Sequence, residues 1–146
     1  MSVTFTENGK RLELDILGYE FPDGKGDMYD VNWLDVGVAY DDGSLSFRQK
    51  DSCLLSYELE ELTEALDGIV EGRETGTIQS FTEPYLSFAV TRVGELYAVQ
   101  VRFVYDTSDG WKTVGVCQGM DLRELAEMNA ELKAMSARFP RREARE

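Results

Sequence analysis

The chain has 146 residues, a formal net charge of −13 and no histidine. Without imidazole there is no histidine general base, no Ser-His or Cys-His nucleophile and no histidine metal ligand. The excess of carboxylates disfavours nucleic acid and anionic membranes as partners and favours basic proteins. This composition therefore predicts a binding protein rather than an enzyme.

The composition also predicts a single folded domain over residues 1–146. Hydrophobic residues make up 42% of the chain, and a chain of this length can bury a core without disulfides or a structural metal. Residues 1–10 lack the pattern of a signal peptide, and no stretch has the length of a membrane span. We therefore expect a cytoplasmic protein with no membrane contact.

The first part of the chain predicts two β-hairpins separated by a loop. Residues 12–16 alternate strictly between apolar and charged side chains, and the turn dipeptide Asn8-Gly9 joins them to a preceding strand. Residues 18–30 combine glycines, a proline and aspartates, which is typical of an exposed loop. Strands at 32–40 and 45–47 then form the second hairpin.

Two segments have the periodicity of amphipathic helices. The first has Ser56 as its expected N-cap and Gly72 as its C-cap, and the second begins with a capping box of Asp121 and Glu124 and ends at Pro140. Their apolar stripes are Leu55, Leu59, Leu62, Leu66 and Ile69 in the first helix, and Leu122, Leu125, Met128, Leu132, Met135 and Phe139 in the second.

Strands with a period of two lie between these helices, at residues 77–82, 86–90, 97–105 and 112–117. The predicted fold is therefore α+β: an antiparallel β-sheet built from hairpins, with two amphipathic helices packed on one side of it. Residues 141–146 are polar, and we expect them to form a frayed tail.

Cys53 and Cys117 both lie among apolar residues, and neither has a nearby cation in the sequence. A reducing compartment keeps such thiols apart, and a nucleophilic thiol needs a base or cation to lower its pKa. We therefore expect two free, unreactive cysteines.

The acidic loop contains Asp23, Asp27 and Asp30 around Gly24 and Gly26. It lacks the ligand spacing of a calcium loop, and no Gly-Lys-Ser/Thr follows that would form a phosphate cradle. The sequence therefore predicts no metal and no cofactor, and it makes this loop a candidate for protein recognition.

Two other segments carry candidate contact residues. Glu58, Glu61 and Glu64 are expected on the outer face of the first helix, as solvated carboxylates. Trp111 follows Asp109-Gly110 in a turn. Its indole is expected either to fold back and pack over the sheet or to act as an anchor residue in a protein interface.

Four runs of sequence carry a resemblance to a known family. They are LDILGYEFP at 14–22, DVNWL at 30–34, CLLSYELEEL at 53–62 and SFTEPYLSF at 80–88. With these runs the chain resembles the WapI family of bacterial immunity proteins over nearly its whole length, and residues 107–120 depart most from the family pattern. The resemblance implies a small cytosolic protein paired with the toxic C-terminal domain of a polymorphic, YD-repeat-type toxin, in many cases a nuclease that acts on RNA.

The resemblance and the charge lead to the same functional hypothesis. An acidic protein can exclude RNA from a nuclease by covering its basic substrate cleft, and this inhibition needs no catalysis. The expected toxin-binding residues are Asp23, Asp27, Asp30, Asp109 and Trp111, with Glu58, Glu61 and Glu64 as an alternative face. The identity of the toxin and the oligomeric state stay open.

Two other classes of function remain possible from the sequence. One is a small-molecule-binding or sensory α+β domain whose apolar pocket is lined by Trp33, Tyr97 or Tyr105. The other is an enzyme that uses carboxylates alone, which requires two inward-facing carboxylates with raised pKa values.

Overall fold

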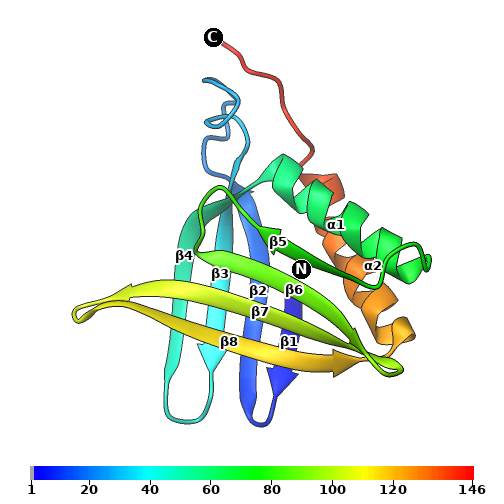
Figure 1. Ribbon diagram of the computed structural model, residues 1–146. Helices are drawn as coiled ribbons and strands as arrows, with labels where there is room; N and C mark the ends of the chain where they lie inside the picture. Colours follow the sequence, from blue (N-terminus) through cyan, green and yellow to red (C-terminus); the bar gives the residue numbers. More distant parts are fainter. Residues whose placement is uncertain (1) are drawn as a thin grey trace.

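The computed structural model describes residues 2–146 as two four-stranded antiparallel sheets and two helices (Figure 1). The first sheet has the order β1-β2-β3-β4, with β1 at Ser2–Glu7, β2 at Lys10–Tyr19, β3 at Trp33–Asp41 and β4 at Ser46–Leu55. The second has the order β5-β6-β7-β8, with β5 at Gly76–Ser80, β6 at Leu86–Val93, β7 at Leu96–Thr107 and β8 at Gly110–Met120. The helices are α1 at Ser56–Val70 and α2 at Leu122–Arg138.

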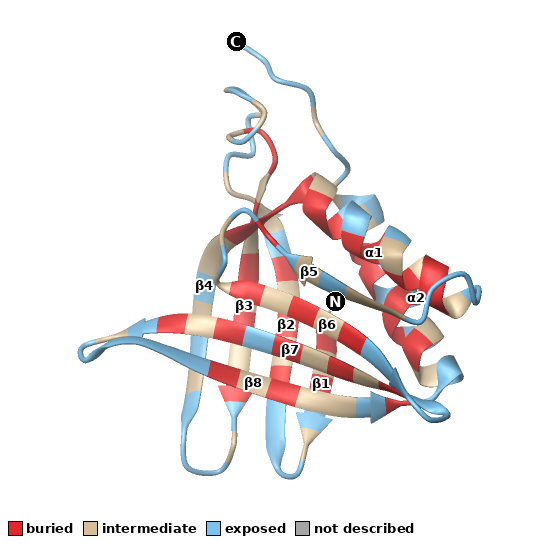
Figure 2. Ribbon diagram, in the orientation of Figure 1, coloured by how far each residue is buried: buried red, intermediate tan, exposed pale blue. Residues whose placement is uncertain are grey.

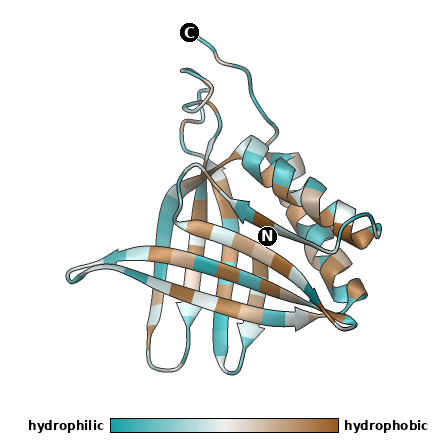
Figure 3. Ribbon diagram, in the orientation of Figure 1, coloured by the Kyte–Doolittle hydropathy of each residue, from teal (hydrophilic) through white to brown (hydrophobic). Residues whose placement is uncertain are grey.

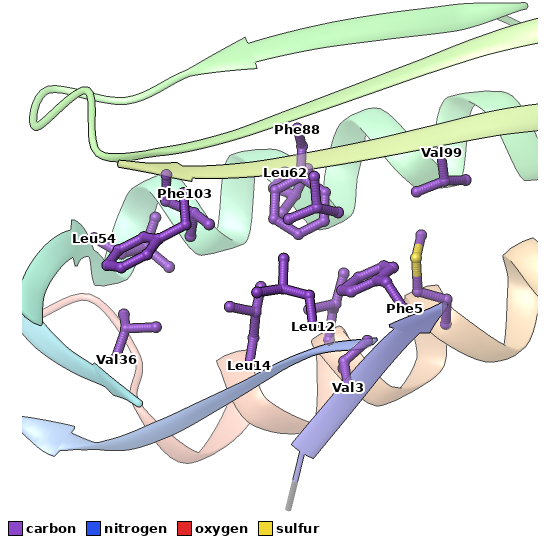
Figure 4. Packing of buried hydrophobic residues seen from close by; sticks show 14 of the residues in the cluster. Val3, Phe5, Leu12, Leu14, Val36, Leu54, Leu62, Phe88, Val99 and Phe103 are labelled. Carbon is purple, nitrogen blue, oxygen red and sulfur yellow. The ribbon is translucent and has the colours of Figure 1, made fainter. Parts of the chain in front are cut away.

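The two sheets face one another, and their strands run across each other (Figure 1). Buried residues alternate with half-buried or exposed ones along most strands, and hydrophobic residues alternate with more hydrophilic ones (Figures 2 and 3). Phe5 of the first sheet meets Phe88 of the second edge to face, with ring centroids 5.7 Å apart (Figure 4). The inner faces of both sheets therefore form one core.

The helices lie side by side along one open side of this sandwich (Figure 1). Both contribute most of their apolar stripes to the same core, including Leu62 and Leu66 of α1 and Leu125 and Leu132 of α2. Leu122, predicted as part of the second stripe, is instead 47% exposed at the start of α2. The α+β class and the antiparallel hairpins are confirmed, but the hairpins divide into two sheets. Among the described residues, neither helix has the length and apolar character needed to cross a membrane.

The predicted turns and caps are mostly confirmed. Asn8 and Gly9 both have positive φ, 44° and 84°, as the tight β1–β2 turn requires. Asp121 caps α2, and its carboxylate accepts a hydrogen bond from the Glu124 N–H at 2.8 Å. The prediction for Ser56 is wrong, because Leu55 is the N-cap of α1 and the Ser56 hydroxyl donates to Asn32 Oδ1 instead.

The segment 141–146, expected to fray, packs against the loop between β2 and β3 in the structure. The Arg142 guanidinium lies over the Tyr19 ring, 3.6 Å from its centroid. The same side chain donates hydrogen bonds to the carbonyl oxygens of Val31, Phe21 and Pro22. Further along, residues 26 and 145 form an isolated antiparallel bridge. No local pattern predicted this contact, because its partners are more than a hundred residues apart.

Candidate functional site

The loop between β2 and β3 projects from one end of the first sheet, beside the C-terminus (Figure 1). Asp27 Oδ1 accepts hydrogen bonds from the N–H groups of Tyr29 and Asp30, both at 2.9 Å, and Asp23 Oδ1 accepts from the Lys25 N–H at 3.2 Å. Asp23 and Asp27 are exposed, and Asp30 is half-buried. The predicted acidic loop is therefore present, and its own carboxylates shape its turns.

The base of this loop is fixed by Asn32, which is completely buried. Its Nδ2 donates to the carbonyl oxygens of Met28 and Arg142, and its Oδ1 accepts from the Ser56 hydroxyl at 2.6 Å and from the Arg142 N–H at 2.8 Å. One amide therefore joins the loop, the start of α1 and the C-terminal segment. A buried polar side chain whose hydrogen-bonding groups are all used in this way has a structural role.

Asp109 and Trp111 lie at the tip of the β7–β8 hairpin, well away from the β2–β3 loop (Figure 1). The Trp111 side chain is 59% exposed, yet its ring stacks on Tyr85 with centroids 5.3 Å apart. One face of the indole therefore covers the sheet, and the rest stays available to a partner. The structure does not bring the five expected contact residues together into a single patch.

Glu58 is not on the outer face of α1, and that prediction is wrong. The residue is only 7% exposed. Its carboxylate accepts hydrogen bonds from the Leu55 N–H at 3.0 Å, from the Thr82 N–H at 2.7 Å and from the Thr82 hydroxyl at 3.1 Å. Glu58 is the third residue of α1, so its side chain can turn back to the helix start. That position in a capping box was the sequence signal that could have revealed this role.

Glu61 and Glu64 are exposed, as expected. Together with Tyr57, Glu60 and Arg141 they line a shallow surface hollow of about 200 Å³. The Arg141 guanidinium already lies over the Tyr57 ring, 5.2 Å from its centroid. The alternative face is therefore an acidic hollow that is partly neutralised by the chain's own C-terminal segment.

Both cysteines are free thiols, Cys53 buried and Cys117 half-buried. Burial, followed by the nearby carboxylate of Asp51, raises the pKa of Cys53 to about 12. Burial also raises the pKa of Asp51, with a further contribution from Glu83. A thiol with such a pKa is protonated at neutral pH and is a poor nucleophile. Within residues 2–146, no three His, Cys, Asp or Glu side chains are grouped so that they could hold a metal ion.

The interior offers little space for a ligand. A cavity of about 20 Å³ lies in the core between the sheets and helices, lined by aliphatic side chains and two phenylalanines. Ligand pockets measure roughly 300–1,000 Å³. Trp33, Tyr97 and Tyr105 do not line this cavity, and Tyr105 instead stacks on Phe47 with centroids 4.5 Å apart.

The structure is a small α+β domain in which the buried polar side chains of Asn32 and Glu58 join segments that are distant in the sequence. A sequence profile described as the Immunity protein WapI-like family matches residues 3–140. The chain belongs to this family of immunity proteins. No curated protein matches the chain. Membership supports a toxin-neutralising role with a toxin protein as partner.

The runs of sequence that carry the resemblance have structural roles in this chain. Asn32, from the DVNWL run, anchors the β2–β3 loop, and Glu58 and Thr82, from two other runs, pair with one another. These residues maintain the fold, so they identify the family without identifying the toxin.

Proposed function

We propose that this protein is a cytoplasmic immunity protein that binds the toxic C-terminal domain of a polymorphic, YD-repeat-type toxin. The observation that carries the proposal is the family match over residues 3–140. In this proposal the toxin domain is a nuclease, and the immunity protein excludes its RNA substrate by covering the basic cleft. Binding alone inhibits the toxin, so the proposal needs no catalysis, no metal and no cofactor.

The charge of the chain supports a basic partner. Its net charge is −13, and residues 138–146 contain four of its arginines against two glutamates, so the rest of the chain is more acidic still. A protein with this field accelerates encounter with a positively charged cleft and repels competing nucleic acid. The β2–β3 loop, which carries the exposed Asp23 and Asp27, projects from the body of the molecule beside the C-terminal segment (Figure 1). This position supports a contribution of the loop to steering.

The test uses the toxin C-terminal domain encoded beside the gene for this chain. The two proteins should co-purify, and the immunity protein should abolish RNA cleavage at an equimolar ratio. The association rate should fall steeply as salt concentration rises, because steering by exposed charges is screened. If the toxin domain does not bind, the proposal is overturned; if it binds but cuts no RNA, only the nuclease part fails.

A further inference from the structure

The outer face of the second sheet carries very little charge for so acidic a protein. Figure 1 views this face directly, and no helix or loop crosses its centre. Its only charged side chains among the described strand residues are Arg102 and Asp106. From β5 to β8 the other outward residues are Gly76, Ile78, Ser80, Ser87, Ala89, Thr91, Val93, Leu96, Ala98, Gln100, Val104, Trp111, Thr113, Gly115, Cys117 and Gly119.

The outer face of the first sheet has the opposite character. Its strands β2, β3 and β4 direct outward the charged residues Arg11, Glu13, Asp15, Asp35, Asp41, Arg48 and Lys50. Several of these side chains pair across the face, such as Arg11 with Glu13 at 3.1 Å and Lys50 with Asp35 at 3.8 Å. This is the usual character of a sheet face in water. The two exposed faces of one molecule therefore differ sharply in charge.

The charge-poor face also exposes large apolar side chains at opposite borders. Ile78 on β5 is 81% exposed, and Trp111 on β8 is 59% exposed and backed by Tyr85. Depletion of charge together with exposed aromatic and aliphatic residues distinguishes the centre of a protein interface from ordinary surface.

Small residues keep the middle of this face flat. Ala89 lies opposite Gln100, and Gly115 lies opposite Arg102. A Cβ at position 115 would meet Arg102 Cγ at 3.2 Å, so the stem of this arginine lies close over Gly115. The face is thus a platform that a complementary protein surface can approach closely.

We propose that this outer face of β5–β8 is the surface on which the toxin domain docks. The inference rests on the proposed function and names the surface that performs it. The centre of the face is uncharged except for Arg102. Carboxylates lie at the strand ends, namely Glu83 before β6, Glu95 in the β6–β7 turn, Asp106, and Asp109 in the β7–β8 turn. A charge-poor centre with an acidic border complements a basic toxin surface whose cationic groups surround the contact.

Two of the cations near the same strand ends are held by contacts within the chain. Arg73 pairs with Glu71 at 3.0 Å, and Arg92 donates to the Gly94 carbonyl oxygen at 3.0 Å. Arg92 keeps its charge, because a carbonyl oxygen does not neutralise a guanidinium, and Lys112 on β8 is exposed. The border has four carboxylates against these two cations, so it stays acidic toward a partner.

The closing experiment places one charge on each face. Ala89 on β6 and Ala39 on β3 are both half-buried alanines on interior strands that point outward. The variants Ala89→Lys and Ala89→Glu should each raise the Kd for the toxin domain by about 30-fold or more, because either charge loses its water in the complex. The matched variants Ala39→Lys and Ala39→Glu should stay within about threefold of wild type. The two charges distinguish contact from long-range steering. If the face only steered a basic partner, Ala89→Glu would associate faster than the wild type, whereas a buried contact is weakened by either charge.

Each outcome decides the inference. Loss of binding by both Ala89 variants, with the thermal midpoint and circular dichroism unchanged, supports it. If these variants bind the toxin domain as tightly as the wild type, the proposal for the docking surface is overturned and the proposed function stands. If the wild-type chain does not bind the toxin domain, both are overturned. If an Ala89 variant fails to fold, Thr91→Lys at the neighbouring exposed position gives the same decision. A dimer of the chain alone that Ala89→Lys dissociates would assign the face to a second copy and overturn the proposal.

Discussion

At the scale of single residues, the buried carboxylate of Glu58 joins segments that are distant in sequence. It accepts hydrogen bonds at the start of α1 and from Thr82 just before β6. An unpaired buried N–H group costs about 1–3 kcal/mol, so a single acceptor that serves two backbone donors has a large effect on stability.

We expect Glu58→Ala to lower the free energy of unfolding by about 2–4 kcal/mol, because the N–H groups of Leu55 and Thr82 lose their acceptor. Glu58→Gln keeps one carbonyl oxygen and should lose less. Urea denaturation measures both effects. The control Glu61→Ala, on the exposed side of the same helix, should change stability by less than about 0.5 kcal/mol. Equal losses at positions 58 and 61 would contradict this role for Glu58.

The buried thiol of Cys53 predicts a dependence of stability on pH. Its pKa is raised from 9.0 to about 12 in the folded protein. Below pH 9 the thiol is protonated in both states; above pH 9 only the unfolded chain ionises. The free energy of unfolding should therefore fall by about 1 kcal/mol per pH unit between pH 9 and 12. Guanidinium denaturation at several pH values measures this slope.

Burial also raises the pKa of Tyr40 to about 12, from an ordinary value of 10.0. Its contribution to the alkaline loss of stability therefore begins only above pH 10. The variant Cys53→Ala should remove the slope between pH 9 and 10 and reduce, without abolishing, the slope above pH 10, where Tyr40 still contributes. An unchanged slope in this variant would refute the assignment to Cys53.

At the scale of elements, the C-terminal segment holds the β2–β3 loop in place. Arg142 bonds to three loop carbonyls, stacks over Tyr19 and meets Asn32 through its main chain. The acidic loop therefore takes its shape from its own aspartates and from a residue at the far end of the chain.

We expect Arg142→Ala to loosen this loop without unfolding the protein, since the core residues stay in place. Lysine-specific protease cleavage after Lys25, which is exposed in the loop, should accelerate by about tenfold or more as local opening becomes easier. The matched control is Arg141→Ala, whose side chain contacts Tyr57 on α1. Cleavage after Lys25 at the same rate in both variants would show that Arg142 does not hold the loop.

At the scale of the whole molecule, the two proposals assign different roles to the net charge and to the charge-poor sheet face: the first acts on encounter with the toxin domain and the second on contact. Long-range attraction acts on the association rate, while desolvated contacts act mainly on the dissociation rate. The β2–β3 loop and the second sheet can therefore serve one complex in different ways.

Changing Asp23, Asp27 and Asp30 together to asparagine should slow association with the toxin domain by about tenfold at low salt. Asparagine retains a side-chain oxygen, so the turn bonds that Asp27 accepts from Tyr29 and Asp30 can persist. Stopped-flow kinetics over a range of salt concentrations measures the effect, which should shrink as salt rises.

The control for this prediction removes the same charge from the other end of the first sheet, with Asp41→Asn, Asp42→Asn and Glu13→Gln. This variant should slow association much less if the β2–β3 loop faces the partner. Equal slowing by the two triple variants would mean that only net charge matters and would reject the loop as a local contributor.

The sequence by itself determined the features that depend on neighbours along the chain. The Asn8-Gly9 turn, the Asp121 and Glu124 capping box, the stripes of both helices and the strand periodicity all arise from short-range sterics and hydrogen bonds. The motif runs likewise identified the family, because most of them lie at turns and at helix or strand starts.

Only the tertiary structure decided how these elements are combined. The alternating pattern makes one face of each strand apolar but does not say which hairpins share a sheet, so the division into two sheets followed from packing. The bond of Glu58 to Leu55 is a local capping contact, but its bond to Thr82 and the bond of Arg142 to Asn32 are not. The last two are the contacts that only the tertiary structure shows. Each of these contacts joins residues far apart in sequence, where local propensity carries no information. The exposed face of β5–β8 became visible only once the strand order placed its uncharged residues side by side.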